Sequence, residues 1–349
     1  MKNILFYLLI VLGFYSLESY GQKTIYSFEP DFRIFTAYAF FNAGGYDKDY
    51  VQMDTIRIEI RKYLDTILKK DYRQNIKDYL SKTKPEFNDI GSYVLNLSND
   101  GNFKWICDSS DTYLKNYYNG LDTFLYNFCQ KVQLQKMWTK YKSKFDSINY
   151  SFQPYAQGAI NDIISFTKID TDYYMKYSDK IHFMSCPLMS HFTAFTYTTN
   201  NIMYIIDGPM NSKPGPGSFY HEALHPPINS MTHDHLDLVN KLSQLFICAQ
   251  KKINGGYNDI ESLFNESFIR TIDKYLSHTY YHSDSITYWK SVEDEYKLGF
   301  ILTFYFYENI PKYLSSGKKL KDYYSDLILN IDVNKEIDRW NNYWRDKKK

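Results

Sequence analysis

The segment Phe219–Asn229, FYHEALHPPIN, places two histidines four residues apart, with a glutamate directly after the first. Residues four apart share one face of an α-helix, so His221 and His225 can bind one metal ion together. Glu222 projects about 100° round the helix from His221, close to such an ion without binding it. From there it can take a proton from water whose pKa a zinc ion lowers to about 7. The pattern therefore predicts a zinc site with Glu222 as general base.

A catalytic zinc ion takes three protein ligands and keeps a fourth position open. One source of the third ligand is the downstream segment LFNESFIRTI, where Glu266 lies in a strongly helical pattern and Glu261 is a weaker neighbour. The other source is the segment MTHDH, which holds His233, Asp234 and His235. If His233 or His235 joined the other three ligands, the site would be closed and structural.

Together these segments resemble the gluzincin zinc metallopeptidases, of which thermolysin is the best-known type. The resemblance rests on HEALH followed about forty residues later by Asn265-Glu266. More narrowly, HExxHxxxN ending at Asn229, with Asn265-Glu266-x-x-x-Arg270 after it, resembles a family of exported bacterial zincin-like proteins of unknown function. The similarity covers roughly residues 181–276, with a fainter likeness at 31–45. The metzincin pattern is not met, because Met231 occupies the position of its third histidine.

The resemblance implies a zinc peptidase that acts on peptides or proteins. It implies the metal ligands His221, His225 and Glu266, with Glu222 as general base. It also implies that the strand predicted at Ile202–Ile206 is the sheet element nearest the cleft. In such folds an edge strand pairs with an extended peptide substrate.

Other residues are candidates for supporting roles. Arg270 lies one turn beyond Glu266 and could orient its carboxylate, or it could form an ordinary surface pair worth about 0.3–0.5 kcal/mol. Asn229 could hydrogen-bond a ligand or the end of its helix. Hydrolysis also needs a hydrogen-bond donor to the oxyanion of the tetrahedral intermediate. The segment YLSHTYYHSD offers four candidates, His278, Tyr280, Tyr281 and His282.

Two prolines directly follow the second histidine. A proline inside a helix removes a backbone hydrogen bond and clashes with the preceding turn, at a cost of about 3 kcal/mol or more. The residue before a proline also avoids helical geometry. We therefore expect the helix to end or kink within a residue or two of His225, and Pro226-Pro227 to turn the chain so that Asn229 swings back towards the site. The carbonyls four residues before the prolines would be left for water or side chains.

The surrounding elements predict a mostly helical α+β protein with a zincin-like fold and one small sheet before the HExxH helix. A dense aromatic run at 31–42 favours a helix, and Pro154 is expected to begin another. Apolar residues recur at helical spacing in 51–81, 112–141, 235–252, 259–276, 289–308 and 320–344. Short segments rich in β-branched and aromatic residues predict the sheet at Ile181–Cys186, Phe192–Tyr197 and Ile202–Ile206.

Residues 1–21, MKNILFYLLIVLGFYSLESYG, predict a cleaved signal peptide, with an uncleaved anchor as the alternative. Their apolar run of 12 residues is shorter than the roughly 20 that span a bilayer. After cleavage no transmembrane segment is expected, and the protein would be secreted or periplasmic. The mature chain would comprise a mainly helical region, 22–170, and a zincin-like metal-binding region, 171–349, or one continuous domain, 22–349.

Composition limits the remaining choices. A net charge of +1 argues against a nucleic-acid partner, which needs a basic surface. Four cysteines, Cys107, Cys129, Cys186 and Cys248, permit three disulfide connectivities in an exported chain, but free thiols fit equally well.

Two alternatives to a peptidase stay open, namely an exported binding module with a non-catalytic zinc ion and a metal-free exported interaction protein. Neither the cleavage preference nor the oligomeric state follows from the sequence.

Overall fold

The computed structural model describes residues 26–46, 53–83, 87–106, 112–191, 193–209, 217–253, 257–281 and 284–346. The predicted signal peptide lies outside these residues. Across the described part of the chain, no helix combines the length and apolar composition that a membrane crossing requires. Most of these residues are helical and four strands form one small sheet, which confirms the predicted α+β class.

The helix α2 (Phe32–Gly44) is central to the N-terminal half, as the aromatic run predicts. The side chain of Asp31 caps its start by accepting a hydrogen bond from the amide of Arg33, and Gly45 ends it with a φ of 95°. A helix that is apolar all round is buried, and α2 has neighbours on several sides. These are α3 (Thr55–Ile67), α4 (Lys70–Thr83), α5 (Phe87–Leu95), α7 (Leu121–Lys131) and α8 (Leu134–Thr167), with α6 (Thr112–Tyr117) beside α5.

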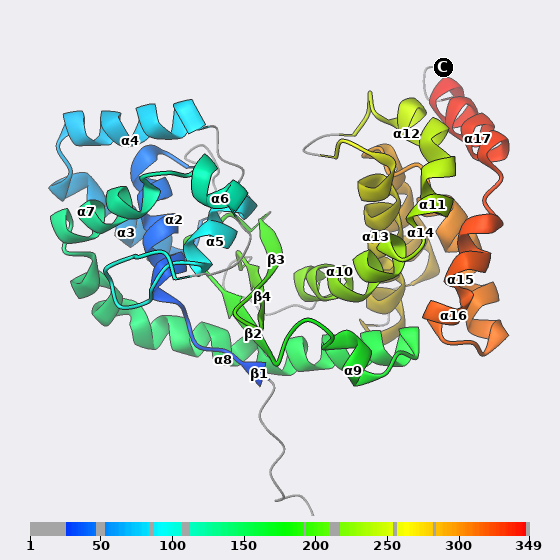
Figure 1. Ribbon diagram of the computed structural model, residues 1–349, viewed down its shortest axis with the longest axis horizontal. Coiled ribbons are helices and arrows are strands. Elements are labelled where there is room, and N and C mark those ends of the chain that lie inside the picture. Colours follow the sequence, from blue (N-terminus) through cyan, green and yellow to red (C-terminus); the bar gives the residue numbers. More distant parts are fainter. Residues whose placement is uncertain are drawn as a thin grey trace, which may run out of the picture.

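The long helix α8 runs along the base of the molecule and links two groups of helices (Figure 1). Pro154 lies inside α8, so the prediction that a helix begins at this proline is wrong. The helix continues because buried side chains anchor it on both sides, among them Phe152 before the proline and Ile160 after it. Burying one such side chain stabilises the fold by about 1.5–3 kcal/mol, so several outweigh the roughly 3 kcal/mol that the proline costs.

The sheet has the strand order β1-β2-β4-β3. Its strands are β1 (Tyr26–Ser27), β2 (Lys180–Ser185), β3 (Ala194–Thr199) and β4 (Ile202–Asp207). The strands β1 and β4 run parallel to β2, whereas β3 pairs antiparallel with β4. Asn200 and Asn201 form the hairpin turn with φ angles of 49° and 59°, as a two-residue hairpin requires. The turn folds β3 back along the outer side of β4, so β3 is one of the two edge strands of the described sheet, and β1 is the other.

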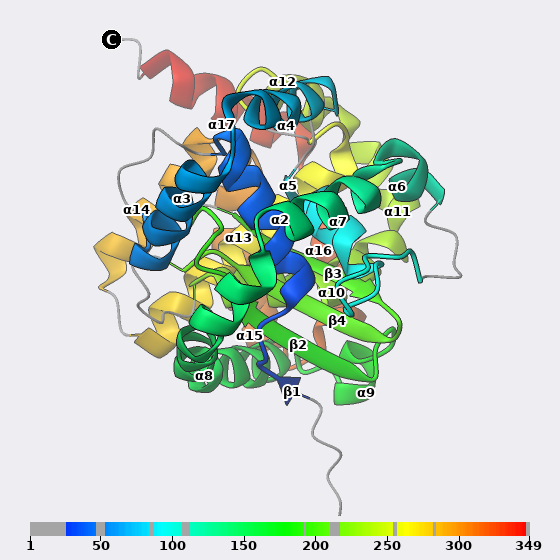
Figure 2. The same ribbon diagram turned by 90° about the vertical axis from the view of Figure 1, so that its left-hand side faces the viewer.

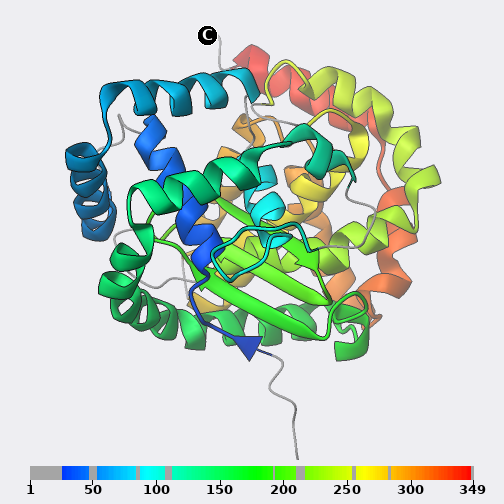
Figure 3. The same ribbon diagram turned by 60° about the vertical axis from the view of Figure 1, so that its left-hand side comes forward.

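The sheet separates two hydrophobic cores. Side chains alternate between the faces of a strand, so Phe183 and Ile205 pack with the C-terminal helices, while Met184 and Ile206 pack with the N-terminal ones. The helices α2 and α7 lie in front of the sheet when the N-terminal side faces the viewer (Figure 2), and the same arrangement is visible at 60° (Figure 3). The two halves thus share the sheet, and the division at residue 170 stays a prediction.

The C-terminal half contains the two helices that carry the motifs, α10 (Gly217–His233) and α13 (Ile260–Tyr281). They pack against each other, and α10 also contacts α8, β3 and β4. The other helical segments are α9 (Thr171–Tyr174), α11 (Leu236–Val239), the 3-10 turn η1 (Asn240–Leu242), α12 (Ser243–Ala249), α14 (Ser285–Lys297), α15 (Thr303–Ser316), α16 (Leu320–Leu329) and α17 (Val333–Asp346).

The described cysteines are not joined by disulfides. Cys129, Cys186 and Cys248 are free thiols, and the first two are buried. Cys107 lies outside the described residues. The free-thiol alternative therefore holds for these three positions.

Candidate metal centre

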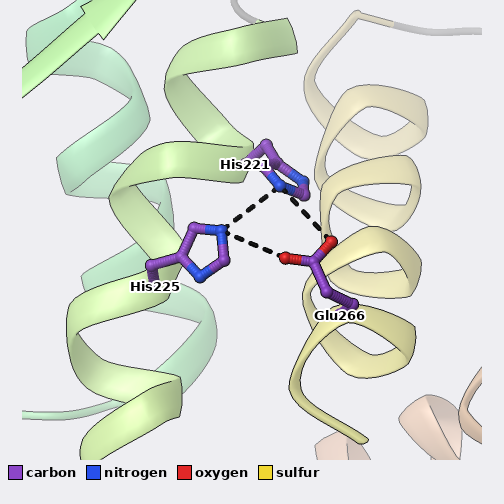
Figure 4. A group of neighbouring side chains, drawn as sticks. All are labelled: His221, His225 and Glu266. Atoms are coloured by element: carbon purple, nitrogen blue, oxygen red, sulfur yellow. Dashed lines mark hydrogen bonds and ion pairs between the residues drawn. The ribbon is translucent and has the colours of Figure 1, made fainter. Parts of the chain in front are cut away.

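Three side chains from α10 and α13 converge on one point between the helices (Figure 4). The Nε2 atoms of His221 and His225 are 3.3 Å apart. One carboxylate oxygen of Glu266, Oε1, lies 3.4 Å from His225 Nε2, and the other, Oε2, lies 3.7 Å from His221 Nε2. The pairing of two histidines on one face of α10 with a glutamate from the packed helix α13 is thus present in the fold.

The donor set and its spacing fit a zinc ion. Ligand atoms at about 2.0–2.1 Å from a tetrahedral centre are about 3.3–3.4 Å from one another, close to the separations of 3.3, 3.4 and 3.7 Å in this site. Burial lowers the pKa of His221 well below its usual value, and the nearby His225 and Arg270 lower it further. A neutral imidazole is the form that binds a metal. Two imidazoles and one carboxylate also match the ligands of a catalytic zinc site.

Glu266 is held in place by a neighbour on its own helix. Arg270 Nε donates to Glu266 Oε2 at 2.9 Å, which leaves Oε1 turned towards His225. Arg270 Nη1 donates to Glu295 Oε2 at 2.8 Å, and its guanidinium carbon lies 4.1 Å from the centre of the Phe300 ring. The side chain of Glu266 is only 8% exposed, so this pair is not an ordinary surface pair. Arg270 therefore lies where it can orient the carboxylate.

The alternative candidates for the third ligand lie elsewhere. His233 is exposed, and its Nδ1 is 4.0 Å from Glu261 Oε1. His235 Nδ1 is 2.8 Å from the carbonyl oxygen of Met231, and Asp234 is exposed. Among the described residues, the group that can hold a metal ion consists of two histidines and one glutamate.

Glu222 is buried beside the two histidines. The hydroxyl of Thr196 on β3 contacts its carboxylate, with 3.1 Å between Oγ1 and Oε2. Burial raises the pKa of Glu222 to about 7. A group with such a pKa can both take up and release a proton near neutral pH, as a general base that later acts as an acid must.

The prediction that the helix ends at the prolines is wrong, because α10 continues through Pro226 and Pro227 to His233. Proline has no amide hydrogen, so the carbonyls of Glu222 and Ala223 lack their usual helical partners. Side chains from other elements replace them. Thr196 Oγ1 donates to the carbonyl of Glu222, and a second hydroxyl donates to that of Ala223, both at 2.8 Å.

The second hydroxyl belongs to the buried Tyr174, at the end of α9. Asn229 stays on the same helix, exposed and at the wall of the cavity, rather than swinging back to the ligands. The predicted role of Asn229 next to the ligands depended on a bend at the prolines, and α10 does not bend away there.

A double-mutant cycle tests whether the hydroxyl of Tyr174 replaces the amide hydrogen that Pro227 lacks. Tyr174→Phe should lower the free energy of unfolding by about 1–3 kcal/mol, because the buried carbonyl of Ala223 loses its donor. With Pro227→Ala, the new amide can bond that carbonyl, and the same change should then cost less than about 1 kcal/mol. Urea unfolding of the four proteins measures both costs. Equal costs in the two backgrounds would show that Tyr174 does not act through the carbonyl.

A cavity of about 1100 Å³ opens beside the three ligands. Five consecutive residues of the edge strand, 194–198, line it, whereas β4 contributes Met203. The prediction that the strand at 202–206 lies nearest the cleft is therefore wrong, because the hairpin places β3 outside it. Asp89 and Ser92 of α5 line another part of the wall, so both halves of the protein contribute to the cavity.

The cavity also holds a side chain that the sequence did not single out. Tyr257 lines it, and the hydroxyl oxygen of Tyr257 lies 3.5 Å from Arg270 Nη2, next to the ligand Glu266. No motif marks this residue among 36 tyrosines.

The three described candidates for the oxyanion donor, His278, Tyr280 and Tyr281, do not line the cavity. His278 stacks on Tyr288 with ring centres 4.7 Å apart, while Tyr280 and Tyr281 are exposed at the end of α13. The reason is the length of α13, since twelve helical residues place His278 about 18 Å along the axis from Glu266. His282 lies outside the described residues.

The asparagine before the third ligand has a structural role. The side chain of Asn265 is buried and accepts a hydrogen bond from Thr232 Oγ1 on α10. Thr232 Oγ1 also lies 2.7 Å from the hydroxyl of Tyr324 on α16. These contacts fix α13 against α10, one residue before Glu266.

Comparisons of the chain with family models, with curated proteins and with solved structures found no match. The likeness to gluzincins therefore rests on the motif residues. What the geometry adds is that His221, His225 and Glu266 meet at one point with Glu222 beside them.

Proposed function

We propose that the chain is an exported zinc-dependent peptidase. The observation that carries the proposal is the convergence of His221, His225 and Glu266 from two helices, at the wall of a cavity that Glu222 also lines. Three ligands leave a fourth position of a tetrahedral ion open to the cavity, which is the arrangement of a catalytic site.

The reaction assigned to the site is the hydrolysis of a peptide bond. A zinc ion, when bound, polarises the carbonyl and lowers the pKa of water to about 7. Glu222 takes the proton of the attacking water and passes it to the nitrogen of the leaving amine as the C–N bond breaks. Tyr257 lines the cavity beside the ligands, and its hydroxyl is the candidate donor to the carbonyl oxygen on which negative charge develops. His221, His225 and Glu266 hold the metal, and Arg270 orients Glu266.

The edge strand supports a peptide as the substrate. An extended peptide can add to an exposed strand edge through main-chain hydrogen bonds. Residues 194–198 of β3 line the cavity in an unbroken row, and Thr196 at the centre of that row contacts Glu222. A peptide paired with β3 would therefore lie next to the general base.

The alternative is a structural zinc site, which is closed by a fourth protein ligand. It requires His233 or His235 to join the group, yet His233 is exposed and His235 bonds the carbonyl of Met231. The described residues thus favour an open site over a closed one.

The test is hydrolysis of a quenched-fluorescence peptide library by the chain from residue 22, loaded with one zinc ion. We expect cleavage that stops on chelation, returns with zinc and is lost in His221→Ala. Thr232 and Asn265 are left unchanged, so the packing of α10 on α13 is retained. If the zinc-loaded protein cleaves no member of the library, the proposal fails in favour of a binding module.

A further inference from the structure

Thr196 reaches two acceptors that belong to one residue. Its hydroxyl lies 2.8 Å from the main-chain carbonyl oxygen of Glu222 and 3.1 Å from the carboxylate oxygen Oε2 of the same residue. A threonine hydroxyl carries one proton and two lone pairs, so it cannot donate fully to both oxygens at once. The two contacts are therefore alternatives for that proton.

Pro226 is the reason that the carbonyl is available. In an uninterrupted helix, the amide of residue 226 would bond the carbonyl of Glu222. Proline has no amide hydrogen, so this carbonyl accepts from Thr196 instead. The proline after the second histidine thus creates a second acceptor directly beside the carboxylate.

We propose that Thr196 is a positioning residue that holds Glu222 in one orientation while it gains and loses a proton. The inference rests on the proposed function. While Glu222 is ionised, the hydroxyl of Thr196 donates to the carboxylate. Once Glu222 carries the proton taken from water, the hydroxyl accepts from the carboxyl group and donates to the carbonyl that Pro226 leaves open. Thr196 neither gains nor loses a proton, and its hydroxyl only turns.

The position of Thr196 extends this role to the substrate. It lies on the edge strand β3, and its neighbours on both sides line the same cavity. The strand with which a peptide would pair therefore also holds the general base. Substrate and base are placed by one element, and their relative position does not depend on the packing of α10 alone.

Tyr174 provides a matched control. It donates to the carbonyl of Ala223, which Pro227 leaves without an amide, at the same 2.8 Å. It differs from Thr196 in that the structure records no contact between Tyr174 and the Glu222 side chain. Thr196→Val and Tyr174→Phe thus each remove one hydroxyl from a carbonyl next to a proline, but only the first also removes a contact to the carboxylate.

Kinetics of the zinc-loaded variants on a cleaved peptide test the inference. Thr196→Val should lower kcat by at least about tenfold while KM and zinc affinity stay within about twofold, and Thr196→Ser should restore kcat. Tyr174→Phe should lose stability but keep kcat within about twofold. The inference is overturned if Thr196→Val keeps the wild-type kcat, or if Tyr174→Phe loses as much.

Crystal structures of the zinc-loaded variants separate this inference from the proposed function. In Thr196→Val the Glu222 carboxylate should leave its wild-type position, and in Tyr174→Phe it should not. If the wild-type protein hydrolyses nothing but the carboxylate moves in Thr196→Val, the peptidase proposal fails and the positioning role stands. If the carboxylate keeps its place in Thr196→Val, the positioning role is wrong whatever the activity.

Discussion

Glu222→Gln is expected to keep the zinc ion and to lower kcat by about 10²–10⁴-fold. Glutamine has nearly the same size and can still accept from Thr196, so His221 and His225 should keep their positions. Its neutral amide cannot take a proton from water, and the general base is lost. Zinc content per chain and kcat on a cleaved peptide measure the two effects separately.

Glu261→Gln is the control for this prediction. It makes the same change on the same pair of packed helices, at a partly exposed position next to His233 and outside the cavity. We expect it to match the wild-type protein in both measurements. Hydrolysis by Glu222→Gln at the rate of the control would show that Glu222 is not the base.

Glu266→Ala is expected to lower zinc affinity by more than about 100-fold, because loss of an outer partner alone costs about 10–100-fold. The change removes the one carboxylate among the three described ligands and leaves Arg270 facing the two imidazoles. Competition with a chromogenic chelator measures the affinity. A ligand that binds only the folded state at 100 times its Kd stabilises that state by about 2.7 kcal/mol, so the zinc-induced rise in Tm should also shrink.

His235→Ala serves as the comparison, since this histidine was an alternative third ligand and bonds the carbonyl of Met231 in the structure. Its zinc affinity should equal that of the wild-type protein. The ligand assignment is wrong if His235→Ala weakens zinc binding and Glu266→Ala does not.

The parts of the site that follow from local spacing were predictable from the sequence. His221 and His225 share a helix face because they are four residues apart, and Glu222 follows from the same geometry. Three of the four strands were predictable because they are short and bounded by turn residues, whereas the two-residue strand β1 was not predicted. Glu266 depended on a resemblance, since it lies 41 positions after His225 and no local rule spans that distance.

The parts that depend on contacts between distant elements were not predictable. The prolines should have ended α10, but Thr196 and Tyr174 replace the missing amides from β3 and α9. Pro154 likewise lies inside α8 because packing on both sides holds the helix. Propensity sets the local cost of a proline, and tertiary contacts decide whether the helix continues.

Neither the order of the strands nor the length of the helices could be predicted from the sequence. The hairpin at Asn200 and Asn201 decides that β3, and not β4, lies along the cavity. The extension of α13 to Tyr281 carries His278 away from the ligands, while Tyr257, before the helix begins, lies beside them. In both cases the residues that line the cavity depend on how distant elements pack together. The residue types within one segment do not specify that packing.

The position of a bound zinc ion tests the central claim most directly. Anomalous diffraction at the zinc absorption edge, on crystals of the protein loaded with one equivalent of zinc, locates the ion. We predict one peak about 2.0–2.2 Å from His221 Nε2, His225 Nε2 and a carboxylate oxygen of Glu266, with its remaining position open to the cavity. A peak at another site, or an ion closed by a fourth protein ligand, would contradict the account.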